Sequence, residues 1–245
     1  MNRDLASHLR SGTQQSHTLS ENTAYMKCFL KGCLQKEIFS ELLGNLYFVY
    51  STLETELLRH KNHPIVSLVN FSQLNRTAHI KEDLAFYYGE NWREKIALSE
   101  AGENYVTRIQ EVSKTEPALL VAHSYVRYLG DLSGGQALKN IVRSALELPP
   151  ELGTRFYEFD AFPSTGEIRQ FKARYRDALN SLPVDEELTQ KIVAEANLVF
   201  RLNCDLLHFL EPKVKDAIGE KQFAEIIGEE KPGSTENTVE LGVIR

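Results

Sequence analysis

Three glycines and one carboxylate interrupt the strongest helical segment of this 245-residue sequence. Apolar and small residues recur at spacings of three and four over residues 119–142, which predicts one long, largely buried helix. Gly130, Gly134 and Gly135 each cost roughly 1 kcal/mol relative to alanine inside a helix. Asp131 is costly to bury unless partners satisfy its oxygens. This combination predicts a functional site in which a hydrogen-bonded polar cluster lies beside bare backbone.

The spacing of the glycines would let a flat ligand lie against the helix backbone. At about 100° per residue, Gly130 and Gly134 lie one above the other on the face that also carries Arg127, with Asp131 at its edge. The glycines together with Ser133 also allow the helix to bend. For one such spacing taken alone, close helix packing or a simple kink is the commoner explanation. The carboxylate favours a site, because Arg127 could be its partner.

Other periodic segments predict helices on both sides of this one. They cover residues 4–17, 22–34, 36–60, 100–113, 167–182 and 185–227. Two prolines and a glycine make residues 146–159 a connection. His60, His63 and His79 lie in or near another polar connection at spacings that give no closed metal site, and we expect them to face solvent.

Composition excludes several classes of protein. A formal charge of −6 and a pI near 5.7 argue against nucleic-acid binding, which needs a dominant positive field. The three cysteines form no CxxC pair and are odd in number, so we expect neither a disulfide framework nor a zinc site, and a cytoplasmic setting. No apolar run reaches 18 residues, so no membrane anchor is expected. The polar residues 228–245 predict a disordered tail.

Residues 122–141, AHSYVRYLGDLSGGQALKNI, resemble the distal-helix signature of the heme oxygenases. The resemblance extends to about Glu211 and is closest to the soluble cyanobacterial and algal members of that family. It implies an all-α fold, a single-domain multi-helix bundle over residues 1–227. Heme would lie between a proximal helix and a kinked distal helix.

The first helix carries the residue that would bind the heme iron. Residues 12–32, GTQQSHTLSENTAYMKCFLKG, resemble the proximal segment of the family, which implies that His17 is the axial ligand. Glu21, four residues on, would orient its ring. From the sequence alone, a histidine near a helix end is most often a surface residue or a partner of the helix dipole.

The remaining site residues come from four other segments. The resemblance places Tyr50 in the distal polar network, although a core tyrosine is nearly as good an explanation. Lys172 and Arg176 lie one turn apart and would bind the heme propionates, whereas a solvated charged face is the usual reason for such a pair. The implied catalytic residues are Asp131, Arg127, Tyr50 and Asn203, and the implied heme-binding residues are Arg10, His17, Glu21, Tyr125, Gly130, Ser133, Gly134, Lys172, Arg176 and Phe200.

The implied activity is oxidation of heme b by O2 to biliverdin, Fe2+ and carbon monoxide, with the IXα isomer as the expected product. Heme is then both substrate and cofactor, and the product would supply bilin and phycobilin synthesis. Asp131 would organise water that delivers a proton, and Arg127, Tyr50 and Asn203 would complete the network.

Electrons must come from a partner, because the sequence has no GxGxxG loop and no iron–sulfur cysteine set. Soluble relatives of this kind use ferredoxin, and a downstream bilin reductase is a further candidate partner. Because ferredoxin is acidic, we expect a basic rim around the heme edge. Its candidate residues are Lys27, Lys31, Lys139, Arg143 and Lys172.

Three alternatives remain open at this point. A carboxylate-bridged di-iron oxidase is also helical, but it needs Glu-x-x-His on two helices, and no Glu-x-x-His occurs here. A heme carrier or sensor would share His17 and the glycines but would not require Asp131. A protein of the same fold that has lost heme would bind a different small molecule.

Overall fold

The computed structural model describes residues 4–228, and every regular element in that range is helical, which confirms the all-α class. The α-helices are α1 (Leu5–Gly12), α2 (Gln14–Glu21), α3 (Ala24–Leu30), α4 (Lys36–Arg59), α5 (Thr77–Tyr88), α6 (Trp92–Lys95), α7 (Glu100–Thr115), α8 (Leu120–Ser124), α9 (Gly130–Ala145), α10 (Thr165–Asn180), α11 (Glu186–Ile218) and α12 (Glu220–Ile227). The shorter elements are η1 (Val66–Leu68), η2 (Ser72–Leu74), η3 (Pro117–Leu119), η4 (Tyr125–Leu129) and η5 (Arg155–Tyr157). Within residues 4–228, no helix combines the length and apolar character needed to span a membrane.

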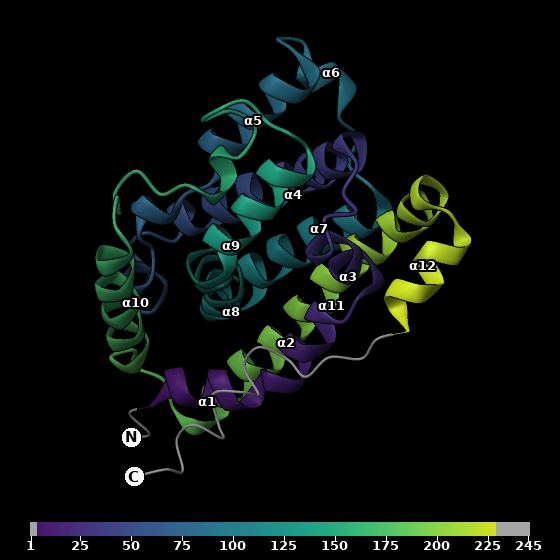
Figure 1. The fold of residues 1–245 in the computed structure, drawn as a ribbon. Helices are drawn as coiled ribbons and strands as arrows, with labels where there is room; N and C mark the ends of the chain where they lie inside the picture. Colours follow the sequence, from purple (N-terminus) through teal and green to yellow (C-terminus); the bar gives the residue numbers. More distant parts are fainter. Residues whose placement is uncertain (1–3, 229–245) are drawn as a thin grey trace.

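Helix α11 holds the two sides of the predicted site together. It runs from α1 at one end of the molecule to α12 at the other (Figure 1). Along the way it packs against α2, which carries the predicted iron ligand, and against α8 and η4 of the distal segment. Val49 and Tyr50 on α4, Ile109 on α7 and Val199 on α11 are completely buried in the core between these helices.

The predicted first helix, residues 4–17, is in fact two helices. Thr13 ends α1 and precedes α2, and its hydroxyl donates to the Leu9 carbonyl at 2.7 Å. A Cβ at Gly12 would lie 2.5 Å from Cγ1 of Val193, so the chain approaches α11 closely at the break. The sequence had suggested that His17 ends the first helix. Instead, His17 lies in the middle of α2.

The predicted last helix, residues 185–227, is also interrupted. Gly219 has a φ of +85°, a conformation that L side chains rarely adopt, and it separates α11 from α12. Helix α12 returns to pack on α3 (Figure 1), and Nζ of Lys27 donates to the Ile227 carbonyl at 3.0 Å. The expected disordered tail lies outside the described residues, apart from Gly228.

The other predicted helices differ only at their ends. Helix α10 begins two residues earlier than expected, because Ser164 and Glu167 form a reciprocal capping box. Helix α3 is shorter than the predicted 22–34. Thr23 caps its start by accepting a hydrogen bond from the Met26 backbone, and Gly32, with a φ of +72°, follows its end.

The predicted long distal helix is interrupted before its glycines. A π-helical turn, η4, separates α8 from α9 and ends immediately before Gly130. Such turns insert an extra residue into the helix and redirect the side chains around it. The predicted continuous helix over residues 119–142 is therefore interrupted at η4, and the expected kink stays a prediction.

Candidate active site

Four side chains from four different elements form a buried polar cluster. The Tyr50 hydroxyl, on α4, donates to Oδ2 of Asp131 at the start of α9. Arg127, in η4, donates through Nε to the Tyr50 hydroxyl at 3.0 Å, and its Nη2 lies 3.8 Å from Oδ1 of Asp131. Its Nη1 donates to Oδ1 of Asn203 on α11 at 2.5 Å. The structure thus brings the four predicted catalytic residues together.

Burial dominates the electrostatics of this cluster. It raises the pKa of Asp131, and Arg127 and the Tyr50 hydrogen bond act against that shift. It also raises the pKa of Tyr50, so the hydroxyl remains a donor. Burial disfavours the charge on Arg127, but Tyr50 and Asp131 outweigh it and hold the pKa of Arg127 above its ordinary value. The cluster therefore contains a permanent cation beside a carboxyl group that can exchange a proton.

The glycines of α9 have two different roles. A Cβ at Gly130 would meet nothing within 4 Å, and one at Gly134 would meet only Leu138 of the same helix, at 3.9 Å. A Cβ at Gly135 would lie 3.6 Å from the Tyr157 ring of η5. Close packing thus explains Gly135 alone. Gly130 and Gly134 leave a strip of open backbone beside the polar cluster, with exposed Ser133 between them.

His17 lies on α2 with one ring nitrogen buried. Its Nδ1 has no hydrogen bond, although Oε2 of Glu21 is 3.6 Å away. The Phe200 ring packs edge-on against the imidazole, with ring centroids 5.7 Å apart. A third of the side chain is exposed. Because Nδ1 faces Glu21, Nε2 is the nitrogen available to a metal outside α2.

Ser20 links the proximal helix to the distal cluster, a role that was not evident from the sequence. Nδ2 of Asn203 donates to the Ser20 hydroxyl at 3.4 Å, while Oδ1 of the same side chain accepts from Arg127. Ser20 lies three residues after His17. A serine on a helix has too many local uses for its type alone to identify such a bridge.

A group of cations lies at the junction of α1, α10 and η4. Lys172 and Arg176 are on α10, and neither forms an ion pair with a carboxylate among residues 4–228. Burial, and the charge of Arg176, lower the pKa of Lys172. Burial raises the pKa of the Tyr125 hydroxyl. The hydrogen bond with Thr13 and the charges of Arg176 and Arg10 oppose this shift. The predicted propionate-binding residues therefore surround one place where an anion would be stabilised.

The sequence missed a second buried polar group, on α5. Arg76 is 1% exposed and Asp83 is completely buried. His79, expected to face solvent, is 9% exposed, because its Nδ1 bonds the Glu158 carbonyl at 2.9 Å. Its partner lies 79 positions away in the sequence, so local polarity could not indicate this burial.

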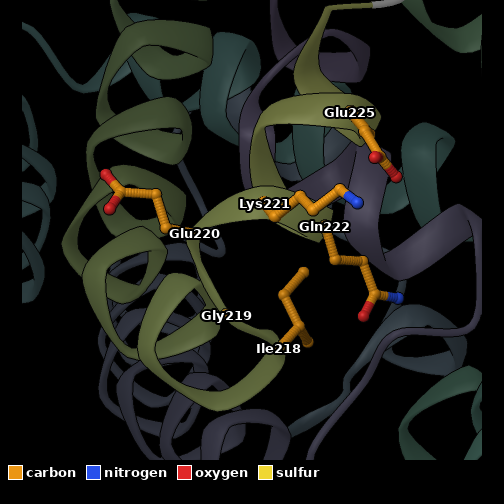
Figure 2. A pocket seen from close by; sticks show the side chains of 6 residues that line it. All are labelled: Ile218, Gly219, Glu220, Lys221, Gln222 and Glu225. Atoms are coloured by element: carbon orange, nitrogen blue, oxygen red, sulfur yellow. The ribbon is translucent and has the colours of Figure 1, made fainter.

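A surface hollow lies apart from these residues, where α11 meets α12 (Figure 2). It is lined by Ile218, Gly219, Glu220, Lys221, Gln222 and Glu225. The Glu220 side chain points away from the others and pairs with Lys215 at 2.7 Å. The hollow shares no residue with the predicted site.

Comparison with known proteins identifies the family. The heme oxygenase family model matches residues 3–209. The chain belongs to the heme oxygenase family. Heme oxygenase 2 of Synechocystis sp. is 54% identical over 233 residues, which cover 95% of this chain and 93% of the relative. Heme oxygenase 1 of Nostoc sp. is 49% identical, with 96% of this chain and 98% of the relative covered.

Solved heme oxygenases have the same fold. The crystal structure of heme oxygenase-2 from Synechocystis sp., in complex with heme and NO, gives a TM-score of 0.94 at 55% identity and covers 95% of this chain and 96% of that one. The heme oxygenase of Leptospira interrogans gives 0.80 at 44% identity, covering 83% and 98%. The family assignment confirms the expected activity class, an oxidoreductase that degrades heme to biliverdin. Among residues 4–228, no group of three or more histidine, cysteine, aspartate or glutamate side chains could hold a metal ion.

Proposed function

We propose that this heme oxygenase opens heme b at the α-meso carbon, producing biliverdin IXα, Fe2+ and carbon monoxide for bilin and phycobilin synthesis. One observation carries the proposal. The open backbone at Gly130 and Gly134 lies beside the buried Asp131 cluster, and Asn203 and Ser20 connect that cluster to the helix of His17. These residues fit a flat, iron-containing dianion. Bound heme supplies the iron at which O2 is activated.

His17 is the proposed iron ligand, through Nε2. A neutral imidazole pushes less electron density onto the iron than a thiolate does, which disfavours early O–O cleavage. Glu21 is placed to accept a hydrogen bond from Nδ1 once the ring settles on the metal, because Oε2 is already 3.6 Å away. Phe200 restricts rotation of the ring by packing on its edge.

Asp131 is proposed to deliver protons through water held at Oδ1. Oδ2 already accepts from Tyr50, so Oδ1 is the oxygen left for water near the open backbone. The raised pKa of Asp131 favours a carboxyl group that can take up and release a proton. Arg127 donates to the Tyr50 hydroxyl and is itself held by Asn203, so these two residues would fix the direction of this transfer.

Lys172 and Arg176 are proposed to bind the propionates, with Arg10 and the Tyr125 hydroxyl beside them. Two anionic groups would relieve the repulsion between Lys172 and Arg176. Because the propionates lie on one edge of heme, binding them selects the in-plane rotation and thus the meso carbon nearest the distal cluster. This accounts for the α isomer.

Ferredoxin is the proposed electron donor, and a bilin reductase the proposed acceptor of the product. The expected basic rim is narrower than the sequence suggested. Lys139 pairs with Glu158 at 2.7 Å, and the Arg143 guanidinium donates to the Pro149 carbonyl at 2.9 Å. Lys172 pairs with no described carboxylate and is the strongest of the candidates. The three free cysteines are in keeping with a cytoplasmic location, which cell fractionation would test.

The test is an anaerobic heme titration followed by O2 with ferredoxin, its reductase and NADPH, observed by visible spectroscopy. We expect a Soret band on titration, then its loss as biliverdin and carbon monoxide form. A stable heme complex under turnover conditions would instead identify a carrier or sensor. Absence of any Soret shift would contradict heme binding and with it the whole proposal. A product isomer other than IXα would contradict only the proposed opening at the α-meso carbon.

A further inference from the structure

Arg76, His79 and Asp83, called here the η5 anchor, form one polar face of α5 at helical spacings of three and four. The Asp83 carboxylate accepts two backbone hydrogen bonds, from the Arg155 amide to Oδ1 at 2.9 Å and from the Phe156 amide to Oδ2 at 2.8 Å. It therefore caps the start of η5, a segment more than 70 positions away.

The other two members of the η5 anchor bind the same segment. Nη1 of Arg76 donates to the Phe156 carbonyl at 3.4 Å and also to the Glu158 carbonyl, and the guanidinium lies 3.7 Å from the centre of the Phe159 ring. His79 bonds the Glu158 carbonyl through Nδ1. Three buried polar side chains thus hold one short stretch of backbone.

The stretch they hold lies against the distal cluster. The Phe156 ring packs edge-on against the Tyr50 ring, with centroids 5.6 Å apart. Tyr50 is the residue that donates to Asp131. Phe156 is 4% exposed, so a shift of η5 would move this ring within a packed core and would displace Tyr50.

The same stretch also supports the distal helix from behind. The Tyr157 ring fills the space beside Gly135, and the Tyr157 carbonyl accepts from Nε2 of Gln136 at 3.3 Å. Lys139 pairs with Glu158 at 2.7 Å. Helix α9 is therefore fixed from the side opposite the open backbone at Gly130.

We propose that Asp83 is a positioning residue for heme oxygenation, holding Tyr50 and α9 in place through η5. The proposal rests on the proposed function of the Asp131 cluster. Asp83 does not touch the heme site and acts only through the two amides that it binds. Losing it would misalign the Tyr50–Asp131 hydrogen bond and slow proton delivery, while His17, Lys172 and the heme contacts on the other side remain.

The charge state of Asp83 adds a pH dependence. Burial raises its pKa to about 7, the hydrogen bonds from Phe156 and Arg155 oppose the shift, and Glu158 and Glu82 add to it. The other charged and titratable groups around η5 are Tyr87, Tyr157, the Arg155 guanidinium, Asp160 and His79. Protonation removes one of the two acceptors, so the anchor weakens as the pH falls below about 7.

The decisive variant is Asp83→Asn, which keeps the size of the side chain but presents an NH2 group to one of the two amides. We expect a heme dissociation constant within about twofold of the parent and a single-turnover rate of biliverdin formation about tenfold lower. In the parent, the single-turnover rate should fall as the pH drops below about 7. The rate of Asp83→Asn measured between pH 5.5 and 8 should not show this fall. In the heme-free protein, amide exchange should be faster at residues 130–139 and 155–157.

Two further variants make the result specific. Asp185→Asn alters an exposed helix cap on α11, where Asp185 accepts from the Leu188 amide at 2.8 Å, and should change none of these quantities. Phe156→Leu keeps the η5 anchor but removes the ring that contacts Tyr50, and should reproduce the slow turnover. If Asp83→Asn does not fold, the turnover rate of Phe156→Leu tests whether η5 acts on Tyr50.

An Asp83→Asn protein that turns over at the parental rate would overturn the proposal, as would one in which heme affinity and rate fall together. Parental turnover in Phe156→Leu would overturn the route through Tyr50. If the parent itself binds heme without turning it over, the proposed function fails. Amide exchange in the heme-free variants would still show whether Asp83 holds α9.

Discussion

The Arg127 guanidinium donates to the side-chain oxygen of Asn203 at 2.5 Å, and this hydrogen bond joins the distal segment to α11. Because Asn203 also donates to Ser20, one amide connects the distal cluster to the proximal helix, three residues from His17. Asn203 therefore links the helix of the proposed iron ligand to the groups proposed to deliver the proton.

Replacing Asn203 should uncouple the two sides. Asn203→Ala leaves Nη1 of Arg127 without its acceptor, and an unsatisfied buried donor costs roughly 1–3 kcal/mol. We expect turnover about tenfold slower at unchanged heme affinity, since Asn203 is neither the proposed iron ligand nor one of the proposed propionate partners. Single-turnover spectroscopy and urea unfolding would measure both effects. The conservative Asn203→Gln should recover part of the rate, and equal loss in both variants would contradict a hydrogen-bonding role.

Removing the Asp131 carboxylate should change the reaction more than the binding. Asp131→Ala should retain heme but oxidise added phenols in a peroxidase-like reaction instead of opening the heme ring. The reason is that no carboxyl group then holds the water that is proposed to deliver the proton. Tyr50→Phe, which removes the donor to Oδ2, should give a milder form of the same defect. A normal biliverdin yield from Asp131→Ala would remove this residue from the mechanism.

Filling the open backbone should stabilise the empty protein and damage the site. Gly130→Ala adds a methyl group to open space in a helix, so the heme-free protein should gain about 1 kcal/mol in free energy of unfolding. Heme should bind at least fivefold more weakly, because the methyl group occupies the ligand's position. Gly135→Ala is the matched control. Its Cβ would make an ordinary 3.6 Å contact with Tyr157, and its heme affinity should not change.

Lys172 and Arg176 should control the product isomer. Lys172→Gln with Arg176→Gln removes both proposed propionate partners, so heme should bind about tenfold more weakly and biliverdin isomers other than IXα should appear on chromatography. Arg174→Gln serves as the control, because Arg174 is exposed and stacks on Phe71 at 5.2 Å. An unchanged isomer ratio in the double variant would place the propionates elsewhere.

Asp83 should give the heme-free protein a pH-dependent stability. Burial raises the pKa of Asp83 from its ordinary 3.8 to about 7 in the folded protein, so between these limits the folded state binds one more proton than the unfolded state. Its contribution to the free energy of unfolding is then fully present below about pH 4 and is lost, by up to about 1.4 kcal/mol per pH unit, as the pH rises to 7. Urea unfolding at pH 5, 6, 7 and 8 should show this slope in the parent and a flatter one in Asp83→Asn. Identical slopes would contradict the shifted pKa.

These two effects of Asp83 have opposite signs with pH. The ionised carboxylate holds both amides of η5 and favours turnover, whereas the protonated form costs less to bury and favours stability. Rate and stability should therefore move in opposite directions between pH 6 and 8.

Periodicity and residue type were sufficient to locate several of the long helices and to point to a site on the distal segment. Spacings of three and four identified α4, α7, α10 and the distal segment, because each buries one apolar face. The exposed Gly130 and buried Asp131 indicated a ligand, since both are costly in a helix without one. The resemblance to the heme oxygenases then gave His17, Tyr50 and Asn203 their roles.

Tertiary contacts decided the rest. The break at Thr13 depends on how closely Gly12 approaches Val193, and the π-turn η4 has no local composition that predicts it. Asp83 is buried with backbone amides more than 70 positions away as its partners, and His79 bonds the Glu158 carbonyl and the Asp160 carboxylate, which are equally distant in the sequence. A sequence specifies which side chains can bear a charge or a hydrogen bond. Only the packed fold determines which of those groups lose water, and with it their ordinary pKa and partners.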